Sequence, residues 1–125
     1  MKNLLALVFL SIFIACSNNK SVIQQYSSPY KDTLIDNSSS SRFYLDTALI
    51  NVYAFDKSGS LLWRTDPWKD NNLMEYRVKR PKIRYFEFKR DKWTDSIEVI
   101  GIGYDNSQFG YLDKLTGRFT FQGQD

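Results

Sequence analysis

Short runs of aromatic and β-branched residues, separated by Gly, Asp and Asn, dominate the chain from Arg42 onward. Runs of this kind are typical of strands and turns, and no segment keeps a helical period for three turns. The pattern predicts six strands, near residues 48–55, 61–65, 82–89, 96–104, 108–112 and 118–122. We therefore expect an all-β fold, mainly antiparallel, built as a small sheet, a sandwich or a meander.

One of these runs has the character of a central strand. Between Ile97 and Tyr104, apolar residues occupy both alternating sets of positions, which predicts a strand covered on both faces. Gly101 and Gly103 in this run indicate a bulge or a close neighbour. A single helical turn is predicted at Asp66-Pro67-Trp68, because Pro is tolerated at the first helical position.

The first sixteen residues follow another pattern. After Lys2, residues 4–15 are apolar except for Ser11, and this run is too short for a spanning helix of about 20 residues. It fits the apolar region of a secretory signal. The run ends in Phe13-Ile14-Ala15-Cys16, which resembles the bacterial lipobox, although Phe13 stands where Leu is usual. The resemblance implies cleavage before Cys16 and a lipid on that cysteine.

A lipid on Cys16 implies an envelope protein held at a membrane. Each buried methylene contributes about 0.8 kcal/mol, so several acyl chains anchor a protein stably. Ser17 follows the cysteine, which resembles the class of lipoproteins sorted to the outer membrane rather than the inner one. The alternatives are an ordinary cleaved signal with an incidental cysteine, or an uncleaved anchor.

Residues 16–41 are polar and rich in serine, ending in Asn37-Ser38-Ser39-Ser40-Ser41. A segment with so few large apolar residues is predicted to be a flexible tether, although Tyr30 and its neighbours have the character to dock on the domain. The predicted organisation is a signal peptide at 1–15, a lipidated tether at 16–41 and a small β domain at 42–125. Within the tether, Asp32-Thr33-Leu34 resembles the Bacteroidota O-glycosylation motif, which implies a glycan on Thr33.

Two absences restrict the chemistry. The chain has no histidine, and Cys16 is its one cysteine. Histidine is the usual general base and the commonest metal ligand, and a lipidated cysteine supplies no thiol. An enzyme would depend on carboxylates, Lys, Tyr or Ser, as glycoside hydrolases do with paired carboxylates. We expect a non-catalytic protein with no cofactor and no metal. The formal net charge of +3 singles out no partner.

Two segments predict similar hairpins, Val52–Trp63 and Gly110–Phe121. In each, an apolar strand ends in Asp, turns through Gly, and resumes with an aromatic residue four positions after that Gly. The Asp accepts hydrogen bonds from turn amides, and Gly takes the positive φ that closes the turn. These hairpins resemble those of quinoprotein-type β-propeller repeats. The resemblance implies local hairpin geometry alone, and no quinone-binding residue is carried over.

The densest positive charge lies in residues 77–92, with aromatic residues interleaved. One hypothesis is a groove for an acidic glycan or lipid headgroups, whereas nucleic acid is not expected for an envelope protein. The alternative is a solvated strand face whose lysines discourage edge pairing. The candidate binding residues in this segment are Arg77, Lys79, Arg80, Lys82 and Arg84.

Three tryptophans form the other candidate set: Trp63, Trp68 and Trp93. Exposed tryptophans bind sugars or protein partners well, but in a β domain they also pack against the core. The loop 68–72 is a candidate binding loop, and its acids and amides match no known calcium loop. We expect a non-catalytic envelope lipoprotein that binds a protein or glycan partner or serves as an accessory subunit. The alternatives are a polyanion or headgroup binder through 77–92 and, third, a carboxylate-based enzyme.

Overall fold

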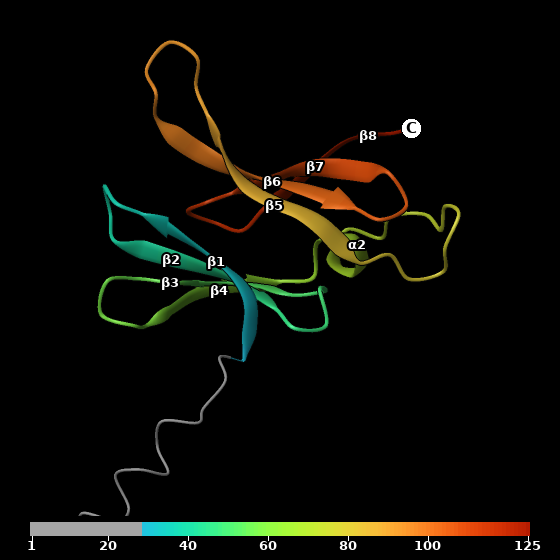
Figure 1. Cartoon of the computed structure of the whole chain (residues 1–125), viewed down its shortest axis with the longest axis horizontal. Coiled ribbons are helices and arrows are strands. Elements are labelled where there is room, and N and C mark those ends of the chain that lie inside the picture. The colour runs from blue at the N-terminus through green and yellow to red at the C-terminus, as the bar shows by residue number, and fades with distance from the viewer. Residues whose placement is uncertain (1–28) are drawn as a thin grey trace, which may run out of the picture.

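The computed structural model describes residues 29–125, which form eight antiparallel strands in two four-stranded sheets. The first sheet, here the N-sheet, contains β1 (Tyr30–Asp36), β2 (Ser41–Asp46), β3 (Val52–Phe55) and β4 (Leu61–Thr65). The second, the C-sheet, contains β5 (Ile83–Arg90), β6 (Ile97–Tyr104), β7 (Gln108–Asp113) and β8 (Phe119–Gln124). Each sheet is a simple meander, and the two lie one above the other in Figure 1. The all-β prediction is confirmed.

A single apolar core fills the space between the sheets. The strands alternate buried and exposed positions, as in β2, where Phe43 and Leu45 are buried and Arg42 is exposed. The C-sheet contributes Ile100 and Ile102, which are essentially inaccessible to solvent. Because both sheets supply this core, neither can bury its apolar face without the other.

The predicted boundary between tether and domain is wrong. We expected residues 30–41 to be flexible, but Tyr30–Asp36 forms β1 and pairs along its length with β2. The serine-rich stretch after Asp36 is the turn between these strands. The reason lies in tertiary contacts: Leu34 packs against the core, and the Asp36 carboxylate meets the Lys114 ammonium at 2.6 Å. An edge strand of mostly polar residues gives a weak signal in the sequence.

The hairpins share one turn chemistry, which the sequence predicted for two of them. The carboxylates of Asp56 and Asp113 accept hydrogen bonds from backbone amides of their own turns, at 2.9–3.0 Å. Gly59 and Gly117 adopt φ values of +88° and +72°. The same arrangement closes two further hairpins, where an Asp stands at the end of the strand or directly after it and a residue of positive φ follows. These turns are Asp36 with Ser40, and Asp91 with Asp95.

The two predicted hairpins also contact each other. The Trp63 indole donates a hydrogen bond from Nε1 to the Lys114 carbonyl at 3.0 Å. Its ring lies against Gly117, where an added Cβ would come within 2.5 Å of the indole. The Trp63 side chain thus holds the β3–β4 strand pair against the turn between β7 and β8.

The strand β6 is central in the C-sheet, as predicted, with β5 and β7 on either side. Its inner face carries core residues, and its outer face carries Gly101 and Gly103. An added Cβ on either glycine would lie 2.9 Å from the Tyr85 side chain, and at Gly101 also from Lys89. Glycine therefore allows these two side chains to lie flat across the strand.

The predicted single turn of helix is present as α2 (Pro67–Asp70). The Asp66 side chain caps it by accepting a hydrogen bond from the Lys69 amide at 3.1 Å, and Pro67 occupies the first turn. In the stretch that the structure describes, no helix has the length and apolar character needed to cross a membrane.

Candidate functional site

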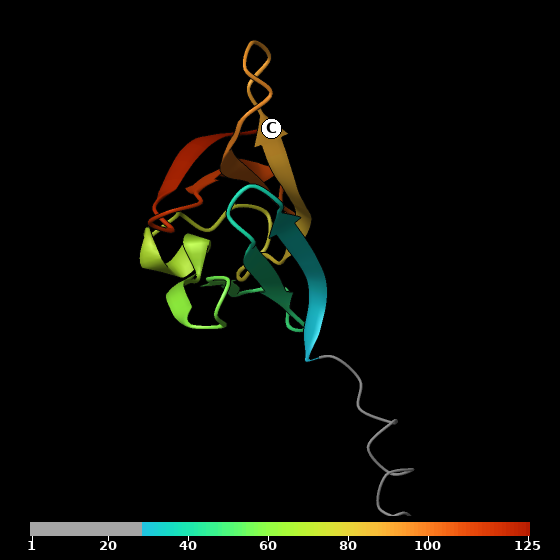
Figure 2. The ribbon, with the colours of Figure 1, turned by 90° about the vertical axis from the view of Figure 1, so that its left-hand side faces the viewer.

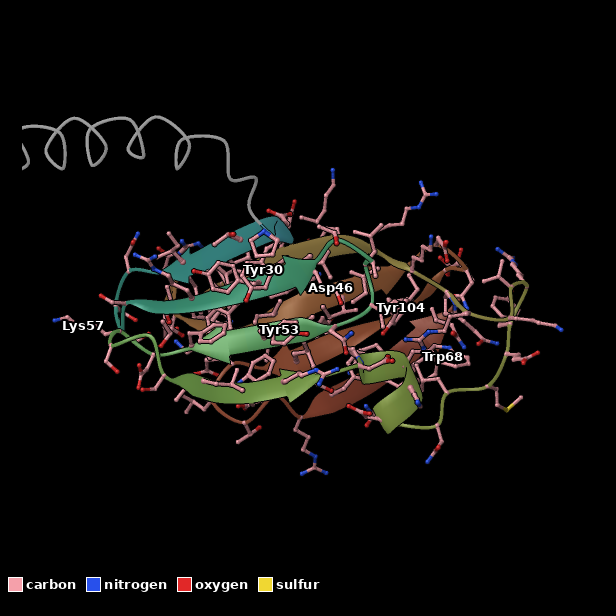
Figure 3. All side chains as sticks on the ribbon, turned by 90° about the horizontal axis from the view of Figure 1, so that it is seen from below. Tyr30, Asp46, Tyr53, Lys57, Trp68 and Tyr104 are labelled. Carbon is pink, nitrogen blue, oxygen red and sulfur yellow. The ribbon has the colours of Figure 1, made fainter. Side chains whose placement is uncertain are left out.

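Four aromatic rings gather on the outer face of the N-sheet, which we call the aromatic face. They are Tyr30, Tyr44, Tyr53 and Phe55. Tyr30 and Tyr44 are stacked with centroids 4.3 Å apart, and Phe55 meets Tyr44 edge-on at 5.6 Å. Figure 3 shows Tyr30 and Tyr53 on the side of this sheet that faces away from the C-sheet.

Strand alternation places these rings outward. In β2 and β3 the core takes Phe43, Leu45, Val52 and Ala54, so the intervening residues point the other way. The register then sets Tyr44 opposite Tyr53, and Arg42 opposite Phe55. Aromatic cross-strand pairs of this kind stabilise a sheet by about 0.2–1 kcal/mol each. Because such contacts can be explained by sheet stability alone, a binding role for this face has to be judged from the polar groups beside the rings.

A groove of about 380 Å³ opens beside the rings, at the end of the sheet where β3 turns into β4. We call it the turn groove. It is lined by Tyr30, Arg42, Tyr44, Phe55, Asp56, Lys57, Ser58 and Gly59. Its size falls within the range of about 300–1,000 Å³ that is usual for small-ligand sites.

Arg42 and Lys57 bring positive charge to the turn groove. Across residues 29–125, neither Arg42 nor Lys57 forms an ion pair. Arg64, on the neighbouring strand, holds its guanidinium 5.6 Å from the centre of the Tyr53 ring, a cation–π contact. Asp56 is the one acid lining the groove in the described part of the chain.

Asp56 is held in a fixed orientation by its turn. Its Oδ1 accepts hydrogen bonds from the Ser58 hydroxyl at 2.6 Å and from the amides of Ser58 and Ser60 at 2.9 Å. The Ser58 hydroxyl and the turn amides lower the pKa of Asp56 below its usual value, so it stays ionised at neutral pH. The Oδ2 atom makes no hydrogen bond within residues 29–125.

Two of the predicted tryptophans lie against the core instead of on a binding surface. Trp63 contacts Phe43 at 5.9 Å between ring centroids and is bonded to the Lys114 carbonyl. Trp68 donates from Nε1 to Gln108 Oε1 at 3.0 Å, while Arg80 stacks on its ring at 5.0 Å. Both indoles are therefore used in packing the domain.

Trp93 differs from the other two because 93% of it is exposed. It lies in the turn between β5 and β6, which projects beyond both sheets in Figure 1. The three tryptophans are therefore not brought together into one surface.

The basic segment 77–92 is divided between two ends of the molecule. Arg77, Lys79, Arg80 and Lys82 precede β5, whereas the residues beyond Lys89 belong to its far end and the following turn. The eight residues of β5 separate these groups by roughly 25 Å. Arg80 pairs with Asp66, and Arg84 is exposed on β5 itself. The segment does not form one compact site.

The acids around α2 serve the local structure. Asp66 caps the helix and pairs with Arg80, while Asp70 Oδ2 accepts hydrogen bonds from Thr65 and from the Asp66 amide. They line a cavity of about 440 Å³ together with Arg64 and Lys69. Within residues 29–125 there is no cluster of three potential metal-ligating side chains.

Two predicted modification sites have different positions relative to the structure. Thr33 is exposed on β1, and its amide donates a hydrogen bond to the Asp32 carboxylate at 2.8 Å. Its glycosylation stays a prediction, but the site lies on a strand and not in a flexible tether. Cys16 and the signal sequence lie outside the described residues. Lipidation therefore stays a prediction as well.

The residues of the aromatic face and turn groove were not selected from the sequence. A signal for them exists in the alternation from Arg42 to Asp46 and from Val52 to Phe55, where aromatic residues occupy the positions between core residues. Comparison of the chain with protein families, with curated proteins and with solved structures gave no match. The site must therefore be interpreted from its own geometry.

Proposed function

We propose that the protein is a lipid-anchored, non-catalytic binding module of the bacterial cell envelope. Its lipid would be carried on Cys16, at the outer membrane rather than the inner one. The β domain would bind a protein or glycan partner through the aromatic face and the turn groove. The observation that carries this proposal is the grouping of four rings on one sheet face beside Arg42 and Lys57, which form no ion pair within residues 29–125.

Several features support binding over catalysis at this face. The rings are fixed by cross-strand contacts, so little entropy is lost when they meet a partner. Aromatic residues and Arg are enriched among the residues that dominate binding energy. The groove presents a single carboxylate, whereas glycoside hydrolysis requires two that flank the substrate.

The binding proposal is tested with the full-length chain, solubilised in detergent and used to capture material from cell envelopes. We expect Phe55→Leu to reduce capture at least fivefold. The matched control is Phe109→Leu, since Phe109 is a phenylalanine on the C-sheet with 39% exposure. Equal capture by both variants and the unchanged chain would overturn the proposal.

The anchoring proposal has its own test. Cells fed an alkyne-tagged fatty acid should label the full-length chain, and Cys16→Ser should abolish the label. Label that persists in the Cys16→Ser variant would show that the lipid is elsewhere. Fractionation of the labelled chain then assigns the inner or outer membrane.

The alternative, a polyanion or headgroup binder through residues 77–92, requires those charges to act together. Because β5 lies between the two groups, a compact ligand such as a single headgroup cannot contact both. We therefore assign the aromatic face the main role. An Arg77→Gln, Lys79→Gln double variant is expected to leave envelope capture within twofold of the unchanged chain.

A further inference from the structure

We propose that the turn groove is a site for an acidic saccharide, a sugar carrying a carboxylate or sulfate, and this inference rests on the binding function proposed above. The structure places three complementary features together there: ring surface, positive charge and a fixed hydrogen-bond acceptor. Each matches one part of such a ligand.

The charge of the turn groove selects for an anion. Arg42 and Lys57 both line it, and neither has an acidic partner within residues 29–125. Arg42 lies on β2 directly opposite Phe55 of β3, so its guanidinium and the ring belong to the same surface. A guanidinium binds a carboxylate or sulfate through two parallel charge-assisted hydrogen bonds, which are stronger than those it forms to the neutral hydroxyl groups of a sugar.

The aromatic rings provide the apolar part of the site. Phe55 and Tyr44 meet edge-on, an arrangement that leaves part of each ring surface toward the groove. The flat apolar face of a pyranose packs on such a ring, while its hydroxyl groups point to the sides. Stacking on a ring does not discriminate between sugars. The polar groups of the groove would therefore determine which sugar binds.

Asp56 and its turn provide the acceptor for sugar hydroxyl groups. The three hydrogen bonds of its turn all go to Oδ1, so within residues 29–125 the Oδ2 atom of this groove-lining carboxylate keeps its capacity to accept. The hydroxyls of Ser58 and Ser60 lie 3.2 Å from each other beside it. A carboxylate held in place by its own turn accepts ligand hydroxyl groups without first being ordered.

A phospholipid headgroup is a less suitable occupant for this groove. It would match Arg42 and Lys57, but a glycerol or ethanolamine headgroup would place no hydroxyl-rich ring against Phe55 and Asp56. A protein partner with an acidic side chain is the other occupant to distinguish. Both are outcomes of the experiment below.

The test uses the full-length chain in detergent and isothermal titration with short oligosaccharides. The acidic probes are oligogalacturonate, a hyaluronan fragment and a heparin fragment. The neutral probe is methyl-esterified oligogalacturonate, which keeps the sugar rings and removes the charge. We expect at least one acidic probe to bind, tenfold or more tightly than the neutral probe, with affinity falling as salt rises.

Two substitutions locate the binding. Arg42→Gln should weaken the acidic probe at least tenfold, and Phe55→Leu should weaken it as well. The matched control is Arg118→Gln, which makes the same charge change at an exposed residue of the turn between β7 and β8. Equal loss in the control would show an effect of net charge alone and would overturn the assignment to the turn groove.

The remaining outcomes separate this inference from the proposed function. If acidic and esterified probes bind equally, the site is a saccharide site but the acidic specificity is wrong. If no probe binds while Phe55→Leu still reduces envelope capture, the saccharide inference fails and a protein partner remains. Binding of anionic vesicles with no oligosaccharide binding overturns it in favour of headgroups. If neither probes nor capture respond, both proposals fail.

Discussion

Individual residues in the turns show how differently the same conformation is used. Gly59 and Gly117 both have positive φ, but an added Cβ at Gly59 would meet nothing within 4 Å. At Gly117 the same atom would overlap the Trp63 ring. One glycine is therefore required by backbone conformation alone, and the other also by packing.

This difference predicts two unequal alanine substitutions. Gly59→Ala should destabilise the fold by about 1 kcal/mol, the cost of a left-handed backbone for a residue with a Cβ. Gly117→Ala should cost about 3 kcal/mol, because overpacking against Trp63 adds to that strain. Urea unfolding of both variants measures the two free energies. Equal losses would show that the contact between Gly117 and Trp63 contributes nothing.

Ser40 predicts a change in the opposite direction. It holds a φ of 59° in the turn between β1 and β2, is exposed, and donates its amide to the Asp36 carbonyl. Ser40→Gly should raise the free energy of unfolding by about 0.5 kcal/mol, since relief of backbone strain exceeds the entropic cost of glycine. Ser39→Gly is the control, and it should destabilise slightly because Ser39 lacks a positive φ.

At the scale of residues, the sequence was sufficient to predict a feature where its physical cause was local. The turn glycines and the acids that bond to turn amides were predicted because each effect acts within five residues. The roles of Trp63 and Trp68 were not decided by sequence. Their partners, Lys114 and Gln108, are 51 and 40 residues away along the chain.

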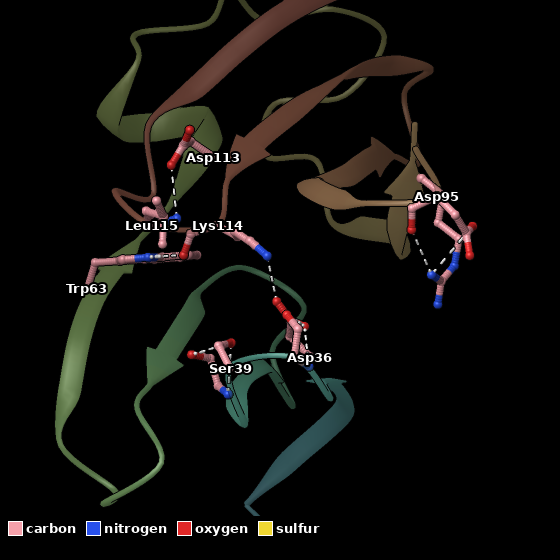
Figure 4. Close-up of polar contacts among 10 residues, drawn as sticks. Asp36, Ser39, Trp63, Asp95, Asp113, Lys114 and Leu115 are labelled. Carbon is pink, nitrogen blue, oxygen red and sulfur yellow. Dashed lines mark hydrogen bonds and ion pairs between the residues drawn. The ribbon is translucent and has the colours of Figure 1, made fainter. Parts of the chain in front are cut away.

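At the scale of elements, β1 is held to the C-sheet by a buried ion pair. Asp36 ends β1, and its carboxylate points across the space between the sheets to Lys114, as Figure 4 shows. Burial opposes ionisation of Asp36, but hydrogen bonds from Lys114 and Ser38 outweigh it and lower its pKa from 3.8 to about 2. A lowered pKa means that the folded state favours the charged carboxylate.

The ion pair therefore predicts a pH-dependent stability. The contribution of Asp36, about 2 kcal/mol, should be complete above its unfolded pKa near 4 and should disappear as the pH falls toward 2. Asp36→Asn should be less stable than the unchanged chain at pH 7, and the gap should close between about pH 4 and pH 2. Denaturant unfolding at several pH values measures that gap. A gap that stays constant down to pH 2 would contradict the ion-pair account.

The strands differ in how well their positions could be predicted from the sequence. Strands rich in aromatic and β-branched residues were predicted near their true positions, from β3 through β8. The strands β1 and β2 were missed, because Tyr30–Asp36 exposes most of its side chains and the serines beside it have the composition of a linker. Only Leu34 and Asp36 face inward enough to fix β1, and their partners lie in other parts of the chain.

For the molecule as a whole, the shared core predicts a single cooperative unfolding transition.

Trp63 lies at the junction between the two sheets, and Trp93 lies outside that junction. Trp63→Phe should cost about 1–3 kcal/mol, through the lost hydrogen bond and reduced packing. Trp93→Phe should change stability by less than about 0.5 kcal/mol. Urea unfolding by circular dichroism measures both, and two separate transitions would contradict the shared core.

The lock between Trp63 and the turn at Lys114 also has a consequence for biosynthesis. The N-sheet is complete in sequence at Thr65, but the residues that cover its inner face and hold Trp63 are translated later, between Ile83 and Phe119. At about 5–20 residues per second, a nascent chain holds Phe43 and Val52 uncovered for several seconds. A chaperone that binds apolar strands during synthesis would therefore find its target in β2 and β3, and would be displaced when β7 and β8 emerge.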